Sequence, residues 1–154
     1  MGAVYFYHLT RQPLERTLPL LLDKALDADW RVEVRCPDLQ RAAWLDEKLW
    51  LNPEDRFLPH GLAGSEDDNL HPVLLTTHPV ENVDCIISVE GSDVSADEVR
   101  EKDRVCILFD GNDETMLSHA RQQWKILSDA KCHLQYWSEE TGHWKKKAEA
   151  NSPE

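Results

Sequence analysis

The sequence DCIISVEGSDVSADEVREKDRVCILF, residues 84–109, decides the fold class. It begins and ends with short apolar runs, residues 84–89 and residues 104–109, and each run is typical of a strand buried in a parallel sheet. Between them, residues 92–102 are polar and predict a short surface helix that Ser95 caps. A strand, a helix and a second strand in this order form the repeating unit of parallel α/β sheets.

Four other segments predict strands: residues 3–9, 31–36, 73–76 and 132–138. The first, AVYFYHL, is rich in β-forming residues and carries no charge, which indicates a central strand covered on both faces. The second, RVEVRC, alternates polar and apolar residues, which predicts a strand with one drier face. We expect the fourth to be the last strand, so that residues 1–138 form a single domain and residues 139–154 form a polar, disordered tail.

Helices are predicted between these strands. Leucines recur at helical spacing over residues 14–29, where Pro19 leaves two readings: Thr17 caps the helix, or an earlier helix is kinked. Asp38 is placed to cap a second helix, whose inward residues are predicted to be Leu39, Ala42, Leu45 and Leu49. A long helix begins at Asn112 or Asp113 and ends near residue 130. The whole pattern predicts an α/β fold, a Rossmann-like, mostly parallel sheet with helices on both faces.

Composition limits the functions that this chain can have. Its 154 residues suit one domain, and 29 acidic against 17 basic side chains give a formal net charge of −12. Neutralising nucleic-acid phosphates requires clustered Lys and Arg, so we expect no direct binding of nucleic acid. The sequence contains no apolar run of membrane-spanning length and no export signal at its start. We therefore expect a soluble cytoplasmic protein that does not contact a membrane.

The patterns of common enzymes are absent from the sequence. The loop after the first strand, residues 8–14, contains no glycine, and neither phosphate-binding glycine motif occurs in the chain. No G-x-S-x-G motif marks a nucleophilic serine. We expect no catalytic residue and no cofactor. The alternative is a degenerate nucleotide-binding or helicase-like enzyme that acts on phosphates through Asp110, Asp113 and Arg11, although the two aspartates equally suit helix capping and loop solubility.

Metal binding and disulfides are also weakly supported. Four cysteines, Cys36, Cys85, Cys106 and Cys132, are widely spaced within or beside strand-like runs, which favours buried reduced thiols over disulfides or metal ligands. The histidines are scattered. His71 and His78 each precede a proline, and one reading is that they share a metal with Asp84. Isolated loop histidines are more often solvated or hydrogen-bonded to the backbone. We expect no metal site.

The helix from Asp113 carries a possible binding surface. At about 100° per residue around the helix, Trp124 lies at the margin of the inward face, and Arg121 and Lys125 lie on the neighbouring solvent-exposed side. An indole beside two cationic donors suits a peptide that ends in an apolar residue with a free carboxylate. The alternative is an ordinary amphipathic helix whose cations are only solvated.

A second possible surface is the stretch LDEKLWLNPEDRFLPHGLAG, residues 45–64. It joins the end of a helix to a loop rich in aromatic, leucine and proline residues. Such a segment usually faces a partner. The alternative is that Trp50 and Phe57 pack against the bottom of the sheet.

This stretch closely resembles the signature of the chi subunit family of bacterial DNA polymerase III. The similarity lies in Leu45-Asp46-Glu47, Leu49-Trp50, Phe57-Leu58-Pro59-His60 and Leu62-Ala63-Gly64, and it extends from residues 4–7 to the helix around Arg121. It implies a non-catalytic accessory subunit of the replicative clamp-loader complex. Such a subunit links the complex, at replication forks, to the acidic carboxyl-terminal tail of single-stranded DNA-binding protein.

The resemblance also implies roles for particular residues. Arg121, Trp124 and Lys125 match the family's Arg-x-x-aromatic-Lys pattern, which binds that tail, although the family's aromatic is a tyrosine and Asp110 is acidic where the family can be apolar. A second set is implied to contact the psi subunit of the clamp loader or a competing helicase: Trp50, Phe57, Pro59, His60 and Leu62. Lys145, Lys146 and Lys147 are interpreted as a solubility feature rather than a DNA contact.

Overall fold

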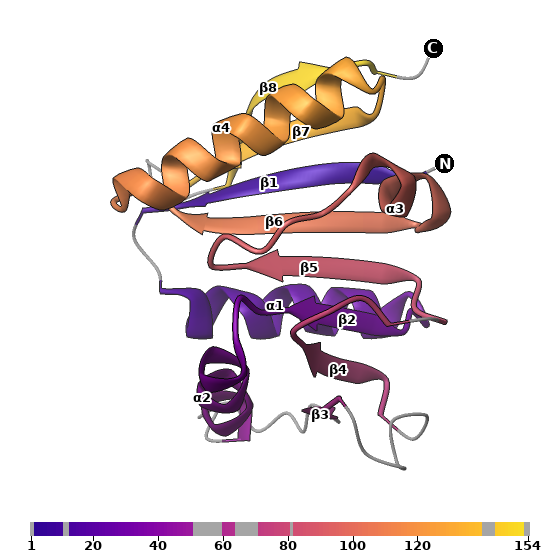
Figure 1. The fold of residues 1–154 in the computed structure, drawn as a ribbon, viewed down its shortest axis with the longest axis vertical. Coiled ribbons are helices and arrows are strands. Elements are labelled where there is room, and N and C mark those ends of the chain that lie inside the picture. The colour runs from indigo at the N-terminus through magenta and orange to yellow at the C-terminus, as the bar shows by residue number, and fades with distance from the viewer. Residues whose placement is uncertain are drawn as a thin grey trace.

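The computed structural model describes residues 2–10, 13–50, 60–63, 71–80, 82–139 and 144–152, apart from the side chains of Glu15 and Trp50. These residues form one eight-stranded sheet in the order β3-β4-β2-β5-β6-β1-β7-β8, together with four helices (Figure 1). The elements are β1 (Ala3–Leu9), α1 (Leu14–Asp27), β2 (Val32–Arg35), α2 (Leu39–Trp50), β3 (His60–Leu62), β4 (Val73–Thr76), β5 (Cys85–Val89), α3 (Ala96–Glu101), β6 (Arg104–Asp110), α4 (Glu114–Asp129), β7 (His133–Ser138) and β8 (Lys145–Ala150).

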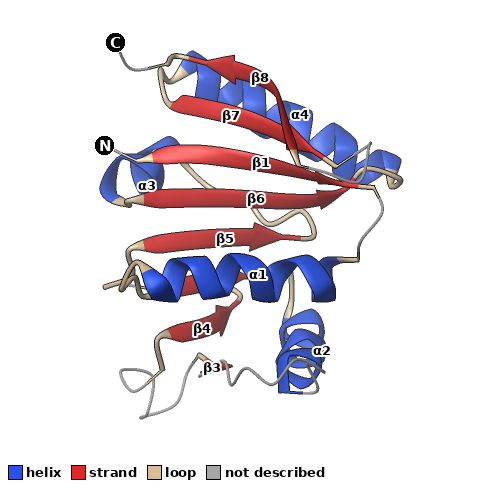
Figure 2. Ribbon diagram, turned by 180° about the vertical axis from the view of Figure 1, so that it is seen from behind, coloured by secondary structure: helices blue, strands red, loops and turns tan. Residues whose placement is uncertain are grey.

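Seven of the strands run parallel, and only β8 is antiparallel to its neighbour β7. Helices α1 and α2 pack on one face of the sheet, and α3 and α4 pack on the other (Figures 1 and 2). The predicted α/β fold with both faces covered is therefore confirmed. No helix among the described residues has the length and apolar character needed to cross a membrane.

The chain leaves the centre of the sheet in two directions. From β1 it crosses through α1 to β2, and from the adjacent strand β6 it crosses through α4 to β7, on the other side of β1. In doubly wound sheets the carboxyl edge between such strands is the usual place for a ligand crevice. This edge and α4 are therefore the two places where a site is expected.

The helix starts were only partly predicted. Helix α1 begins at Leu14 with Pro13 as its N-cap and carries a buried Pro19 in its interior. The helix therefore starts before Thr17, as the reading with an earlier helix predicts, and Thr17 does not cap it. Asp38 caps α2 as predicted, because its Oδ1 accepts the Arg41 backbone N–H at 2.8 Å. The prediction that Leu39 points inward is wrong: at the first position of α2 this side chain is 71% exposed.

Strand β2 corrects a second expectation. Its alternating polar residues predicted one wetter face, but Glu33 and Arg35 are both buried. Arg35 binds Glu33 at 2.7 Å and also pairs with Glu98 of α3, while the Thr76 hydroxyl donates to Glu33 at 2.8 Å. Buried charges are tolerated when they are paired and hydrogen-bonded. The network therefore joins β2 to α3, whose predicted cap Ser95 forms a reciprocal capping box with Glu98.

The carboxyl-terminal segment is more ordered than its sequence predicts. Residues 145–150 form β8, so the expectation of a disordered tail is wrong for this segment. Just before β8, the Trp144 ring packs edge-on against Tyr7 with the centroids 5.2 Å apart. The aromatic contact and the pairing with β7 together hold β8 on the edge of the sheet.

Candidate functional site

Helix α4 presents the predicted cationic surface on a firmly packed base. Asp113 caps the helix by accepting the backbone N–H groups of Thr115 and Met116 at 2.9 and 3.1 Å. On the inward face of α4, Ala120, Gln123 and Leu127 are buried, and Met116 is half-buried. The buried Gln123 amide oxygen accepts the Val94 backbone N–H at 3.0 Å. Because the inward face is fixed in this way, the rotation of the outer face is fixed too.

Trp124 is half-buried and held by other rings. It contacts Phe6 of β1 edge-on at 5.2 Å and Tyr136 of β7 at 6.0 Å. Aromatic pairs with these geometries are favourable beyond their buried area. The indole therefore offers a fixed apolar edge rather than a fully exposed apolar surface.

Arg121 and Lys125 lie beside this indole and are exposed. Neither side chain forms an ion pair or hydrogen bond with any residue that the structure describes. Arg35, Arg41 and Arg100, in contrast, are each paired with a carboxylate. We call Arg121, Trp124 and Lys125 the α4 patch. It combines two donors without partners and one ordered apolar ring.

The base of the α4 patch continues to the carboxyl edge of the sheet through His8. The Nδ1 atom of His8 lies 2.6 Å from the Tyr136 hydroxyl, and its ring packs on Phe109 at a tilt of 38°, with the centroids 5.1 Å apart. Gly111 covers this ring so closely that an added Cβ would lie 1.7 Å from Nε2. The turn after β6 can therefore approach His8 only with glycine at position 111.

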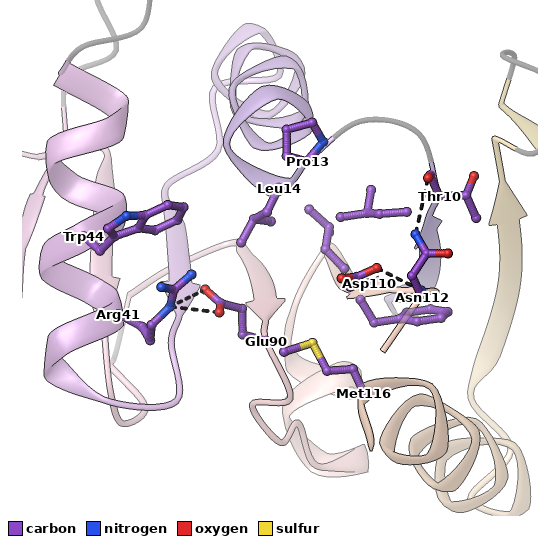
Figure 3. A pocket seen from close by; sticks show the side chains of 12 residues that line it. Thr10, Pro13, Leu14, Arg41, Trp44, Glu90, Asp110, Asn112 and Met116 are labelled. Atoms are coloured by element: carbon purple, nitrogen blue, oxygen red, sulfur yellow. Dashed lines mark hydrogen bonds and ion pairs between the residues drawn. The ribbon is translucent and has the colours of Figure 1, made fainter. Parts of the chain in front are cut away.

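At the carboxyl edge itself lies a cavity of about 380 Å³ (Figure 3). Its polar groups are already bonded to one another: Arg41 Nε pairs with Glu90 at 2.9 Å, and Asp110 accepts the Asn112 backbone N–H at 2.9 Å. The rest of its lining is largely apolar and includes Leu14 and Trp44. Two carboxylates and a single, paired cation make this described lining unsuited to a phosphate.

Asp110 and Asp113, the two described residues of the predicted alternative enzyme, do not form a phosphate site together. Asp113 serves as the helix cap, which agrees with the capping role weighed for it. Asp110 turns its carboxylate toward the Asn112 backbone. Arg11 lies outside the described residues.

The cysteines occupy buried structural positions, and the described histidines form no metal site. All four cysteines are buried and unbridged, as predicted, and burial raises the pKa of the Cys36 thiol to about 12. Among the described residues, no three His, Cys, Asp or Glu side chains are grouped as metal ligands. The alternative with His71, His78 and Asp84 is therefore not formed. Asp84 instead accepts the Arg31 backbone N–H at 2.9 Å.

The second predicted surface is only partly visible. Phe57, Pro59 and the side chain of Trp50 lie outside the described part of the chain. His60 is only 1% exposed, and its Nε2 lies 3.2 Å from the Asp46 carbonyl oxygen. Leu62 is 37% exposed at the end of β3, the edge strand opposite β8.

Two residues of the α4 patch environment were not singled out from the sequence. Tyr136 contacts Trp124 and His8 contacts Tyr136, but they come from β7 and β1, which are far apart in the chain. No local pattern marks such a contact. The pairing of β1 with β7 brings them together, and that pairing is a property of the whole sheet.

Comparison with known proteins agrees with this architecture. The chain shares 50% identity over 34 residues with DNA polymerase III subunit chi of Escherichia coli (strain K12), a stretch that covers 22% of this chain and 23% of that relative. The family model described as DNA polymerase III chi subunit matches residues 1–135, which include every element up to the first half of β7. On this match the chain belongs to the DNA polymerase III chi subunit family, whose members are accessory subunits in replication.

Proposed function

We propose that this chain is a non-catalytic adaptor of the replicative clamp-loader complex and that its α4 patch binds the acidic carboxyl-terminal tail of single-stranded DNA-binding protein. The observation that carries the proposal is the pair Arg121 and Lys125, exposed and without partners in the described structure, beside an ordered indole. The protein as a whole has a net charge of −12. Because the protein as a whole is acidic, an acidic peptide is attracted only to the place where these two cations lie.

The chemistry of the α4 patch suits the two ends of such a tail. Arg121 presents a planar guanidinium, which pairs well with a terminal carboxylate. The fixed edge of Trp124 offers apolar contact to the last side chain, and Lys125, one turn further along α4, offers charge to an acidic residue. Because the aromatic base is already ordered, binding requires little reorganisation.

A second partner completes the adaptor. We assign the surface of Trp50, Phe57, Pro59, His60 and Leu62 to the psi subunit or to a helicase that competes with it. Family membership supports this assignment, and so does the exposure of Leu62. Because His60 is buried and lies against Asp46 of α2, we give it a supporting role within this surface, in which it holds β3 against α2 rather than contacting the partner itself. Such an adaptor acts in the cytoplasm, at replication forks.

Calorimetric titration with a synthetic tail peptide tests the proposal. Arg121→Ala is expected to weaken binding by about 1–3 kcal/mol, the usual contribution of a hydrogen bond to a charged group. The matched control is Arg16→Ala, which removes an exposed helical arginine from α1, on the opposite face of the sheet. Equal affinity of the wild-type protein and Arg121→Ala for the peptide would exclude the α4 patch as the binding site.

A further inference from the structure

Strand β8 brings a second group of cations toward the α4 patch. It begins with Lys145, Lys146 and Lys147, all exposed, and it lies beyond residue 135, where the family match ends. Figure 1 shows α4 running across β7 and β8. Only a lysine on the same face of the sheet as α4 can extend the α4 patch.

The face of each lysine follows from its neighbours. Trp144 packs on Tyr7, within the cluster of side chains under α1 and α2. Successive side chains of a strand point to opposite faces. Lys145 therefore lies on the α4 face, and Lys146 lies on the α1 face, where its Nζ pairs with Glu149 at 3.2 Å.

The register of the sheet gives the same assignment. Lys145 is paired with Ser138, and Ser138 stands two residues after Tyr136 on the same face of β7. The Tyr136 ring contacts Trp124 of the α4 patch. Within the described structure the side chain of Lys145, like that of Arg121, forms no ion pair or hydrogen bond.

The order of these cations along α4 can also be derived. Asn151, just after β8, donates its side-chain N–H to the Ser128 carbonyl oxygen at 2.9 Å, which fixes one end of β8 against α4. Arg121 lies two turns before Ser128, about 11 Å toward the carboxyl edge. Lys145 lies six residues before Asn151, but a β-bulge at Lys147 removes one step of rise, so the distance is about 17 Å in the same direction. Along this direction Lys145 thus stands roughly 6 Å beyond Arg121, the span of about two extended residues.

We propose that Lys145 extends the α4 patch into one binding strip for an acidic peptide, in which Arg121 takes the terminal carboxylate and Lys145 contacts a carboxylate two to four residues before it. The inference rests on the proposed function, because it assumes that the α4 patch binds such a peptide. Two cations without partners near one another repel, and an anionic peptide relieves that repulsion.

Two peptides and two adjacent variants test the inference. The first peptide ends in phenylalanine with acidic residues two to four positions before it, and the second has serines at those positions. Lys145→Gln is expected to weaken binding of the acidic peptide about 2–5-fold at low salt and to leave the serine peptide unaffected, as for an exposed ion pair. Lys146→Gln removes the same charge from the other face and is expected to change neither affinity.

The outcomes separate the two proposals. If the wild-type protein binds neither peptide, the proposed function fails and this inference fails with it. If both peptides bind and Arg121→Ala weakens them, but Lys145→Gln matches Lys146→Gln, the α4 patch stands and the role of Lys145 is overturned. Melting temperatures of both variants confirm that β8 is intact. Lysines on an edge strand also discourage strand addition, and that general role would not distinguish Lys145 from Lys146.

Discussion

The rings of Trp144 and Tyr7 meet edge-on at 88°, with their centroids 5.2 Å apart. Trp144 immediately precedes β8, and Tyr7 lies in β1, two strands inward. The contact therefore reaches across β7 and anchors the edge of the sheet to its centre. It also orients Lys145, the next residue, toward α4.

Trp144→Ala is expected to lower the free energy of unfolding by about 1–3 kcal/mol, less than the loss for a fully buried tryptophan, because Trp144 is half-buried. Urea unfolding measures this change. Leu20→Ala, which removes an apolar side chain 52% exposed on α1, serves as the control and should cost less than 1 kcal/mol. Similar losses in the two variants would mean that Trp144 does not anchor β8.

The central strands could be predicted from the sequence, whereas β8 could not. Strands β5 and β6 are continuous apolar runs, and burial on both faces is the only environment that suits them. Strand β8 reads KKKAEA and has no apolar periodicity. Its order comes from hydrogen bonds to β7 and from Trp144, which are tertiary contacts that no local pattern reveals.

The side chains of the candidate site, and those of β2, were likewise predicted from the sequence only in part. Helical periodicity placed Arg121 and Lys125 outside and Trp124 at the margin, and the structure agrees. The alternation in RVEVRC gave the wrong environment for Glu33 and Arg35, because their partners Thr76 and Glu98 are distant in sequence. A charged residue in a strand indicates a solvent-exposed face only when no oppositely charged side chain pairs with it.

The Arg35 network predicts a loss of stability in acid. Partial burial is the largest single influence and opposes ionisation of Glu98, but the hydrogen bonds from Arg35 and Ser95 and the charge of Arg35 together outweigh it and lower the pKa of Glu98 below its ordinary value. A lowered folded-state pKa stabilises the folded protein above the unfolded-state pKa, and this stability is lost as the pH falls through the folded-state pKa. The free energy of unfolding should therefore decrease below about pH 4.3.

Urea unfolding at a series of pH values between 3 and 7 measures this dependence. Glu98→Gln removes the titrating group, so its stability should change less with pH over the acidic range, although it is less stable at pH 7. Asp97→Asn, at the neighbouring exposed position of α3, is the control and should keep the wild-type dependence. A wild-type pH dependence in Glu98→Gln would assign the acid sensitivity to other carboxylates.

Gly111 and His8 predict a coupled pair of substitutions. Gly111→Ala places a Cβ 1.7 Å from the His8 Nε2, and the His8 ring is held by Phe109 and Tyr136, so it cannot move away at little cost. We expect Gly111→Ala to lower the free energy of unfolding by about 1–3 kcal/mol, the usual cost of overpacking. Adding Gly111→Ala to His8→Ala should cost clearly less, because the clash is gone. A double-mutant cycle measures the difference, and additive losses would show that the clash is not the cause.

The cavity at the carboxyl edge predicts no response to nucleotides. Its carboxylates, Glu90 and Asp110, would repel phosphates, and its cation Arg41 is already paired with Glu90. A ligand at 100 times its dissociation constant stabilises a protein by about 2.7 kcal/mol, which raises the melting temperature of a domain of this size by roughly 5–10 °C. We expect no such rise with ATP or GTP and magnesium at millimolar concentration, measured by thermal shift.

The acidic tail peptide is the positive control in the same assay, since it should raise the melting temperature through the α4 patch. Glu90→Gln gives a second comparison, because it removes one carboxylate from the cavity and leaves Arg41 without its partner. If nucleotide stabilises the wild-type protein and Glu90→Gln strengthens that effect, the cavity binds phosphate and the enzymatic alternative gains over the adaptor. If Glu90→Gln alone responds, the native ion pair is what keeps phosphates out, and the adaptor function stands.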